Sequence, residues 1–158
     1  MIDLPQDDLL IRAAVPADFP ALAGVRGTDA AERYHWLQRI SAYADGSHSP
    51  QLALATRIIY IAEQQGEIAG FIAGHLTKRY DCDGELQWID VLPAYRRGGI
   101  AGRLLQKLAG WFIVQHAQRV CVNCAPDNTP AMRFYLKNGA QPLNEFWLLW
   151  PDIGLVGR

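Results

Sequence analysis

The chain has 158 residues, of which half are hydrophobic and a fifth are charged, and this composition suits one globular domain spanning residues 1–158. Its 15 basic and 16 acidic residues leave a net charge of -1, which argues against nucleic acid as a partner, and no Lys/Arg run is present to hold a membrane surface. Residues 1–10 carry acids and only short apolar stretches, so we expect neither a signal peptide nor a membrane span, and a cytoplasmic location.

The N-terminal third of the chain predicts one strand, two helices and a loop. Turn residues and capping residues follow the first apolar run and mark where helices begin. In chain order, the elements are a strand at 9–14, a turn at 16–18 leading into a helix through Val25, a helix capped by Thr28 or Asp29 and running to about Tyr43, and a loop at 45–50.

The middle third predicts three consecutive strands of the antiparallel type. Ile and Tyr are frequent in its apolar runs, and Gln65-Gly66 between the first two runs is a plausible hairpin turn. The strands cover residues 57–63, 67–77 and 85–92, with a second turn at 80–84 and Pro93 ending the third strand.

The C-terminal third predicts helices alternating with strands. Apolar residues mark one helical face between Gly99 and Gln118, and Gly139 stands in the usual place for the left-handed cap of a second helix. The elements are a helix at 99–118, a strand at 119–125, a helix beginning at Asn128 or Thr129, and one or two last strands that include 145–150. The whole order predicts a mixed α/β fold, with helices on both faces of a mixed sheet and a ligand site near strand ends and helix N-termini.

The chain has three cysteines, Cys82, Cys121 and Cys124. An odd, small number argues against a disulfide framework. Cys121 and Cys124 form a C-x-x-C within a predicted strand, where positions three apart point to opposite faces, and no second pair exists to complete a zinc site. We therefore predict buried structural thiols and no metal site.

The segment from Val91 to Gly102 carries the strongest chemical signal, because a strand runs into a Gly-rich turn and the turn runs straight into a helix. Backbone N–H groups at a helix start lack partners within the helix, and the helix dipole favours an anion there. Glycines let the backbone approach phosphate oxygens closely, and Arg96 and Arg97 add positive charge. The segment therefore predicts a phosphate-binding turn.

Two common phosphate motifs do not fit this turn. The P-loop needs a Gly-Lys followed by Ser or Thr, and the chain has none. The dinucleotide fingerprint needs G-x-G-x-x-G after the first strand of its unit, whereas residues 98–102 read Gly-Gly-Ile-Ala-Gly and follow a later strand. Taken alone, the glycines are equally compatible with a tight turn before a helix.

Two sequence blocks resemble the motifs of the GNAT N-acetyltransferase superfamily. Residues 96–101, Arg-Arg-Gly-Gly-Ile-Ala, match its pyrophosphate motif Q/R-x-x-G-x-G/A, with Ala101 as an accepted alternative to Gly, and residues 89–95 resemble the usual lead-in. Residues 128–140 match a second family pattern, N-x-x-A-x-x-F-Y-x-x-x-G, in the family's order and spacing. The resemblance is best over residues 57–150 and looser in the N-terminal helices.

This resemblance implies the GNAT fold, a mostly antiparallel mixed sheet of six to seven strands that is splayed in the middle and has helices on both faces. It also implies acetyl-CoA as the acyl donor, without a metal. The pyrophosphate would lie on the Gly-rich turn, and the pantetheine arm would pair with the strand at 87–92 like an added strand. The implied cofactor contacts are Ile89, Val91, Arg96, Arg97, Gly98, Gly99, Ile100, Ala101, Gly102, Asn128 and Tyr135.

The resemblance also implies catalytic roles. Tyr135 would be the general acid that protonates the departing thiolate, since a phenol with a pKa of about 10 stays protonated at neutral pH, whereas Asn128 either binds the coenzyme or caps its helix. Glu85 is the candidate general base; a solvated strand-end carboxylate, a water chain and an already neutral amine are the alternatives. Asp90, the other carboxylate of the strand, lies on the opposite face unless a bulge intervenes. An N–H at Val91 or nearby would stabilise the developing oxyanion.

The acceptor site is expected between the second helix, the loop at 46–50 and the last strands. Trp36 and Ile40 have the helical spacing that is more typical of a core than of a binding site. The candidate acceptor contacts are Arg33, Tyr34, His35, Trp36 and Arg39.

These features predict an N-acetyltransferase that moves an acetyl group directly from acetyl-CoA to a primary amine of a small molecule or peptide in a ternary complex. Two alternatives stay open: a non-catalytic acyl-CoA-binding sensor, which would tolerate loss of Tyr135, and a transferase that uses another acyl group. A homodimer is a further hypothesis, because an exposed apolar strand such as residues 146–150 invites a partner.

Overall fold

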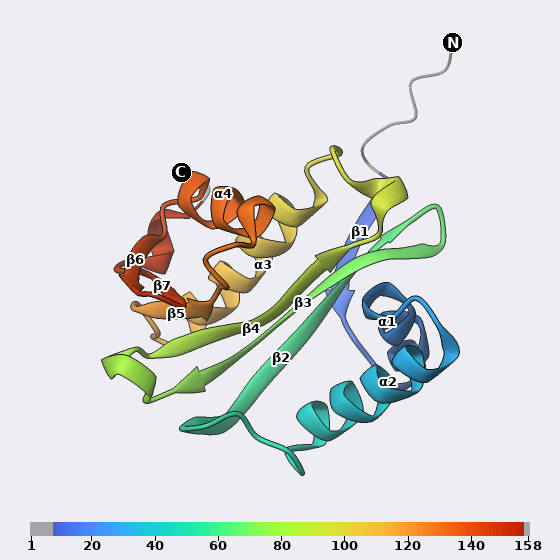
Figure 1. The fold of residues 1–158 in the computed structure, drawn as a ribbon, viewed down its shortest axis with the longest axis horizontal. Helices are drawn as coiled ribbons and strands as arrows, with labels where there is room; N and C mark the ends of the chain where they lie inside the picture. The colour runs from blue at the N-terminus through green and yellow to red at the C-terminus, as the bar shows by residue number, and fades with distance from the viewer. Residues whose placement is uncertain (1–7, 157–158) are drawn as a thin grey trace.

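The computed structural model describes residues 8–156, which fold around one seven-stranded sheet in the order β1-β2-β3-β4-β5-β7-β6. Helices α1 and α2 lie on one side of the sheet and α3 and α4 on the other (Figure 1). Within these residues, no helix is both long enough and apolar enough to cross a membrane. The strands are β1 (Leu9–Ala13), β2 (Ala53–Gln64), β3 (Glu67–Thr77), β4 (Gly84–Val91), β5 (Val120–Asn123), β6 (Gln141–Asn144) and β7 (Trp147–Trp150), and the α-helices are α1 (Phe19–Arg26), α2 (Ala30–Asp45), α3 (Ile100–Val114) and α4 (Thr129–Lys137).

Strands β1 to β4 form a continuous antiparallel run. The two residues between β2 and β3, Gln65 and Gly66, have φ angles of 55° and 79°, as a two-residue hairpin turn with left-handed residues requires. The predicted hairpin is therefore confirmed. Strand β2 begins at Ala53, four residues before the predicted start, because an irregular register between Ala53 and Arg57 extends its pairing with β3.

Strands β4 and β5 are parallel neighbours that pair over only three residues, from Gly84 with Val120 to Leu86 with Val122. Beyond this point β4 continues to Val91, whereas β5 ends at Asn123. The sheet is therefore splayed in the middle, as the family resemblance implied, and the far half of β4 has a free edge.

A β-bulge interrupts β4 where it pairs with β3. Trp88 lies opposite Ala73 and Leu86 lies opposite Gly74, so Gln87 is an extra residue without a partner in β3. Successive side chains of a strand normally point to opposite faces of the sheet. The extra residue shifts this alternation, so each later side chain of β4 points to the face opposite to the one that regular alternation gives. Glu85 and Asp90 consequently share one face of the sheet, the face that α1 and α2 cover.

Two apolar cores lie on the two faces of the sheet. On one face, the buried side chains of α3 pack against the strands, and they include Leu104, Leu105, Leu108 and Phe112. This spacing confirms the predicted apolar face of the helix. On the other face, Leu22 of α1 and the α2 residues Ile40 and Tyr43 pack over Phe71, Ala73 and Trp88 of the sheet.

Helix α3 ends at Val114 and not at the predicted Gln118. His116 has a left-handed φ of 62°, and the N–H of Ala117 bonds to the carbonyl oxygen of Phe112 at 2.9 Å. These two features close the helix and turn the chain toward β5. The second predicted stop, Gly139 after α4, is confirmed by its φ of 98°.

The last two strands differ from the expectation in one important way. Strand β7 lies between β5 and β6, and its residues Leu148, Leu149 and Trp150 are buried. The prediction that residues 146–150 form an exposed apolar strand is therefore wrong, and the expected homodimer loses that basis; only Phe146 in this segment is strongly exposed. Strand β6 contains Pro142 and occupies the edge position where a strand tolerates proline.

The three cysteines are buried free thiols, and Cys121 packs with Cys82 in a small cluster while Cys124 belongs to the core beside α3. The prediction that Cys121 and Cys124 point to opposite faces is thus confirmed. Among residues 8–156, no group of three or more His, Cys, Asp or Glu residues is arranged to hold a metal ion.

Candidate functional site

The turn between β4 and α3 is shaped by two left-handed residues. Arg97 has a φ of 79° and Gly99, the N-cap residue of α3, has a φ of 77°. No side chain bonds to the first N–H groups of α3, and the first helical bond runs from the N–H of Arg103 to the carbonyl oxygen of Gly99 at 3.1 Å. The N–H groups of Ile100, Ala101 and Gly102 therefore have no partner within the helix.

The glycines in and directly after the turn have open space where a side chain would stand. A Cβ atom built on Gly99 or Gly102 would meet no other atom within 4 Å, and one on Gly98 would meet only the carbonyl oxygen of Tyr95 at 3.7 Å. Open space, unpaired N–H groups and the positive end of a helix dipole together form a site suited to a phosphate group.

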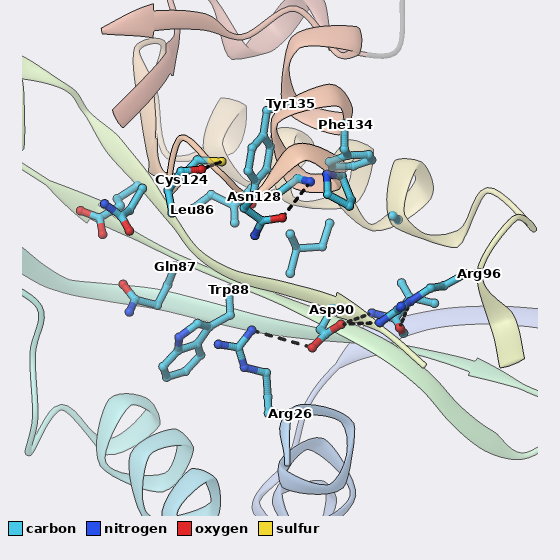
Figure 2. Close-up of a pocket in the computed structure, with 18 residues that line it drawn as sticks. Arg26, Leu86, Gln87, Trp88, Asp90, Arg96, Cys124, Asn128, Phe134 and Tyr135 are labelled. Atoms are coloured by element: carbon cyan, nitrogen blue, oxygen red, sulfur yellow. Dashed lines mark hydrogen bonds and ion pairs between the residues drawn. The ribbon is translucent and has the colours of Figure 1, made fainter. Parts of the chain in front are cut away.

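A cavity of about 810 Å³ occupies the gap between β4 and β5 (Figure 2). Its walls come from β4, from the end of β5, from α4 and from the start of α3. The lining residues are Arg26, Glu85, Leu86, Gln87, Trp88, Ile89, Asp90, Val91, Arg96, Ala101, Asn123, Cys124, Ala125, Asn128, Pro130, Ala131, Phe134 and Tyr135.

Most of the predicted site residues thus line a single cavity. They are Glu85, Ile89, Val91, Arg96, Ala101, Asn128 and Tyr135. The remaining five, Arg97, Gly98, Gly99, Ile100 and Gly102, lie in or directly after the adjoining turn and do not line the cavity.

The free edge of β4 presents its backbone to this cavity at Ile89 and Val91. The N–H of Leu92 bonds to the carbonyl oxygen of Ala69 at 2.8 Å, so Leu92 and Asp90 direct their backbone groups toward β3. Because backbone groups alternate along a strand, those of Ile89 and Val91 point the other way, into the gap.

Side chains already occupy both backbone groups of Val91. Its N–H donates to Oδ1 of Asp90 at 3.0 Å, and its carbonyl oxygen accepts from Nε of Arg96 at 2.9 Å. Asp90 in turn lies between two arginines, with Nη1 of Arg26 at 3.8 Å and Nη2 of Arg96 at 3.6 Å. Burial raises the pKa of Asp90, and the two arginines partly oppose that rise.

Tyr135 projects from α4 on the wall facing Trp88 and Asp90 (Figure 2). Its ring packs edge-on against Trp150 at 5.9 Å between centroids, and the Nε1 of Trp150 donates to the carbonyl oxygen of Asn138 at 3.0 Å. The residue is only 6% exposed, and burial raises the pKa of its hydroxyl far above the ordinary value. The hydroxyl therefore stays protonated at neutral pH.

Asn128 is the N-cap residue of α4, since its Oδ1 accepts from the N–H of Ala131 at 3.3 Å. The same side chain lines the cavity. Capping and a contact with a bound molecule are therefore compatible, because the amide nitrogen of Asn128 is not used by the cap.

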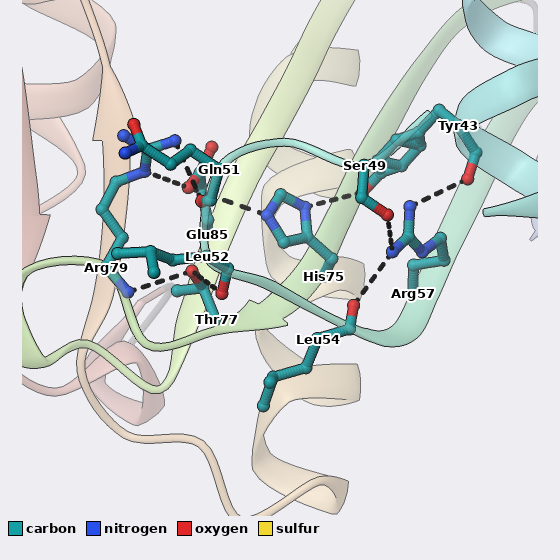
Figure 3. Close-up of polar contacts among 10 residues, drawn as sticks. All are labelled: Tyr43, Ser49, Gln51, Leu52, Leu54, Arg57, His75, Thr77, Arg79 and Glu85. Carbon is teal, nitrogen blue, oxygen red and sulfur yellow. Dashed lines mark hydrogen bonds and ion pairs between the residues drawn. The ribbon is translucent and has the colours of Figure 1, made fainter. Parts of the chain in front are cut away.

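Glu85 is buried and belongs to a polar cluster under the β4 bulge (Figure 3). Nε of Arg79 donates to its Oε1 at 3.0 Å, and Nε2 of His75 lies 3.7 Å from the same oxygen. His75 is fully buried, and its Nδ1 is paired with the hydroxyl of Tyr43 at 2.9 Å. The alternative that Glu85 is a solvated strand-end carboxylate is therefore wrong.

A second cavity, of about 230 Å³, adjoins the first. Both cavities are lined by Glu85, Gln87, Trp88 and Asn123, and the second also reaches His48, Pro50 and Trp147. These walls match the predicted acceptor region of the second helix, the following loop and the last strands.

Only one of the five predicted acceptor contacts lines this second cavity, and it is Arg39. Arg33, Tyr34 and His35 are exposed on other sides of α2, and Trp36 packs edge-on against Trp88 in the core at 5.8 Å. The sequence reasoning missed Arg26, Gln87 and Asn123 as lining residues. No local pattern indicates them, since Arg26 reaches the cavity through the packing of α1 and Gln87 through the bulge.

The family of the chain follows from its sequence. The model of the acetyltransferase (GNAT) family matches residues 28–140. The chain therefore belongs to the GNAT family, whose members are acyl-CoA-dependent acetyltransferases.

Solved structures share its fold at low sequence identity. A protein of the GNAT family from Desulfovibrio desulfuricans has a TM-score of 0.75 at 14% identity, over 92% of this chain and 99% of that chain. The PaiA N-acetyltransferase from Thermoplasma acidophilum, in complex with coenzyme A, has a TM-score of 0.69 at 15% identity over 90% and 98%. The ribosomal-protein-S18-alanine N-acetyltransferase from Escherichia coli has a TM-score of 0.65 at 17% identity over 91% and 94%. A search of curated protein sequences gives no significant match to the chain.

Proposed function

We propose that the chain is an N-acetyltransferase that transfers an acetyl group from acetyl-CoA to a primary amine in a ternary complex. The observation that carries this proposal is the cavity between β4 and β5, which runs from the uncapped start of α3 to Tyr135. A phosphate site near one end and a hydroxyl at the other fit the pyrophosphate and the thioester of acetyl-CoA.

Coenzyme A would contact the turn before α3 and the cavity beside it. The pyrophosphate would be held by the N–H groups that follow Gly98, where two open glycine positions leave room for it, with positive charge from Arg96 and Arg97. The pantetheine amides would bond to the β4 edge at Ile89 and Val91. At Val91 this contact requires Asp90 and Arg96 to release the backbone groups that they now occupy.

The proposed chemistry is a direct transfer. When bound, acetyl-CoA supplies the electrophile: the amine nitrogen forms a bond with the acetyl carbon, the carbon–sulfur bond breaks, and coenzyme A leaves as a thiol. Tyr135 would give its hydroxyl proton to the departing sulfur, and Glu85 would take the proton that the amine loses. The N–H of Ile89 is the better candidate for oxyanion stabilisation, because that of Val91 already has an acceptor.

Two other functions fit part of the same observations. A non-catalytic sensor of acyl-CoA would need the start of α3 and the β4 edge but no hydroxyl beside the thioester, so Tyr135 favours an enzyme. A transferase for a larger acyl group would need extra space beside Tyr135. Comparing acyl-CoA donors of different size in the assay distinguishes this possibility from acetyl transfer.

Titration calorimetry with acetyl-CoA tests the cofactor directly, and Gly102→Glu is the informative variant. A Cβ atom at Gly102 would have open space around it, and an acid in the first turn of a helix stabilises it, so the fold should be preserved. The new carboxylate would repel the pyrophosphate, and we expect the affinity to fall about tenfold or more. Gly110→Glu, on the same helix and equally open, is the matched control and should bind like the wild type.

A folded wild-type chain that does not bind acetyl-CoA would remove the proposal. Binding without transfer to any amine would instead favour the sensor. Equal binding by the wild type and Gly102→Glu would show that the pyrophosphate lies elsewhere.

A further inference from the structure

The acceptor amine can be narrowed to a chemical class, and this inference depends on the proposed function. The smaller cavity adjoins the acetyl end of the larger one through the residues they share, among them Glu85 and Gln87. Its volume of about 230 Å³ lies below the range of roughly 300–1,000 Å³ that drug-sized ligands occupy. The part of the acceptor that enters it is therefore small.

Gln87 offers a binding group for the amine. It is the extra residue of the β4 bulge, and its Oε1 atom is buried with no hydrogen-bond partner among the described residues. A buried acceptor without a partner costs free energy unless a ligand satisfies it. An amine N–H placed between Oε1 of Gln87 and the carboxylate of Glu85 would satisfy this atom beside the thioester end of the larger cavity.

The positive charges around the smaller cavity are not equivalent. The guanidinium of Arg79 is paired with Glu85 at 3.0 Å, and its Nη2 donates to the carbonyl oxygen of Gln51 at 3.1 Å. Arg57 does not line this cavity, and its three nitrogen atoms donate hydrogen bonds to acceptors on Tyr43, Ser49, Leu54 and Ala55.

Arg39 lines the same cavity and has no such partner. Among residues 8–156 it makes no ion pair and no hydrogen bond, its Nε is buried without an acceptor, and its guanidinium lies 5.8 Å from the ring centroid of Trp36. Glu85 is the one carboxylate among the described residues that line the cavity, and Arg79 already neutralises it. The wall therefore has one uncompensated positive charge, which suits an anionic group on the acceptor.

We propose that the acceptor is a small primary amine that also carries a carboxylate. Its amine binds at Glu85 and Gln87, and its carboxylate binds the guanidinium of Arg39. The aromatic side chains of Tyr43, Trp88 and Trp147 enclose the apolar body between these two ends. A peptide N-terminus has an amide where this class has a carboxylate, and it would leave Arg39 unpaired.

Initial rates of coenzyme A release test this class. The protein amino acids, β-alanine and γ-aminobutyrate are each compared with the corresponding C-terminal amide at the same amine concentration. We expect at least one free carboxylate to have a kcat/KM about tenfold or more above its amide, the factor that one charge-assisted bond supplies. Arg39→Gln should remove that preference by lowering kcat/KM for the carboxylate alone.

Arg33→Gln is the matched control, since Arg33 lies on the same helix, is exposed and bonds only to the carbonyl oxygen of Thr28. Arg33→Gln should keep the wild-type preference for free carboxylates. This result would show that losing a positive charge elsewhere on α2 does not remove the preference. Amides, diamines or peptides that react as well as the free carboxylates would overturn this proposal and leave the acetyltransferase in place. Acetyl-CoA binding without transfer to any amine would overturn the proposed function itself.

Discussion

His75 and Glu85 face each other across the ladder between β3 and β4, with Nε2 of His75 only 3.7 Å from Oε1 of Glu85. Both side chains are buried, and Nε2 has no hydrogen-bond partner among the described residues. The pair holds a carboxylate at the junction of two cavities, where an isolated one would be expensive to bury. Arg79 and His75 thus fix the position of Glu85, which lines both cavities.

Glu85→Gln should lower kcat by about 100-fold or more, the usual contribution of a general base, while the Kd for acetyl-CoA stays nearly constant. Steady-state rates and calorimetry on the same preparation check both parts. Asp90→Asn is the comparison, because Asp90 lies on the same face of β4 but between Arg26 and Arg96. A larger loss of kcat in Asp90→Asn than in Glu85→Gln would assign the base to Asp90.

Tyr135→Phe should lower kcat with little change in the affinity for acetyl-CoA, because a proton donor acts mainly in the transition state. Since burial raises the pKa of Tyr135, its hydroxyl stays protonated through alkaline pH, and we expect no fall in kcat below about pH 10 from this group. A pH profile of kcat measures this. Tyr95→Phe is the control, because Tyr95 bonds to Glu67 at 2.9 Å outside the cavity; unchanged turnover by Tyr135→Phe in a chemistry-limited assay would contradict the role.

Asp18→Asn should weaken the fold at neutral pH by about 1 kcal/mol, a charge-assisted bond discounted for solvent screening. Two bonds of 2.9 Å from Arg12 lower the pKa of Asp18 below its ordinary value of 3.8. The stabilisation is therefore present above pH 3.8 and disappears as the pH falls through the lowered pKa. Urea unfolding at pH 7 and at pH 3 measures the difference, and the exposed Asp127→Asn should show none; a constant difference at both pH values would exclude the pair as its source.

Gly84→Ala should destabilise the fold by about 1–3 kcal/mol, the usual cost of overpacking a core. A Cβ at Gly84 would collide with the ring of Phe112, which is fully buried and has no room to move. Gly110→Ala, on the exposed side of α3 with open space around it, should instead stabilise the fold by about 0.5–1 kcal/mol. Thermal unfolding of the two variants gives shifts of opposite sign, and a neutral Gly84→Ala would show that β4 can move away from α3.

The sequence predicts the features of this molecule that depend on local chemistry. Turns and helix caps need particular residues at particular backbone angles, and those residues can be recognised in the sequence. Examples are the hairpin at Gln65-Gly66, the caps at Asn128 and Gly139, and the Gly-rich turn before α3. The order of β2, β3 and β4 follows from their short connections.

The bulge at Gln87 was not predictable in the same way, because nothing in the residues 84–91 distinguishes an extra residue from regular alternation. Its position depends on how β4 meets both β3 and the first residues of β5. For that reason the facing of Glu85 relative to Asp90 stayed open, and Gln87 itself was not a candidate. Strand β6 is similarly hidden, since Gln-Pro-Leu-Asn has no strand character apart from its pairing with β7.

The shared wall of the two cavities bears on the order in which molecules arrive and leave. The larger cavity continues toward α3, whereas the smaller one continues toward the loop after α2 and toward Trp147. In the proposed ternary complex, neither molecule would have to leave its own cavity for the other to enter, and no side chain between them would be needed to store the acetyl group. Double-reciprocal plots with both reactants varied should then intersect, in contrast to the parallel lines of a ping-pong enzyme.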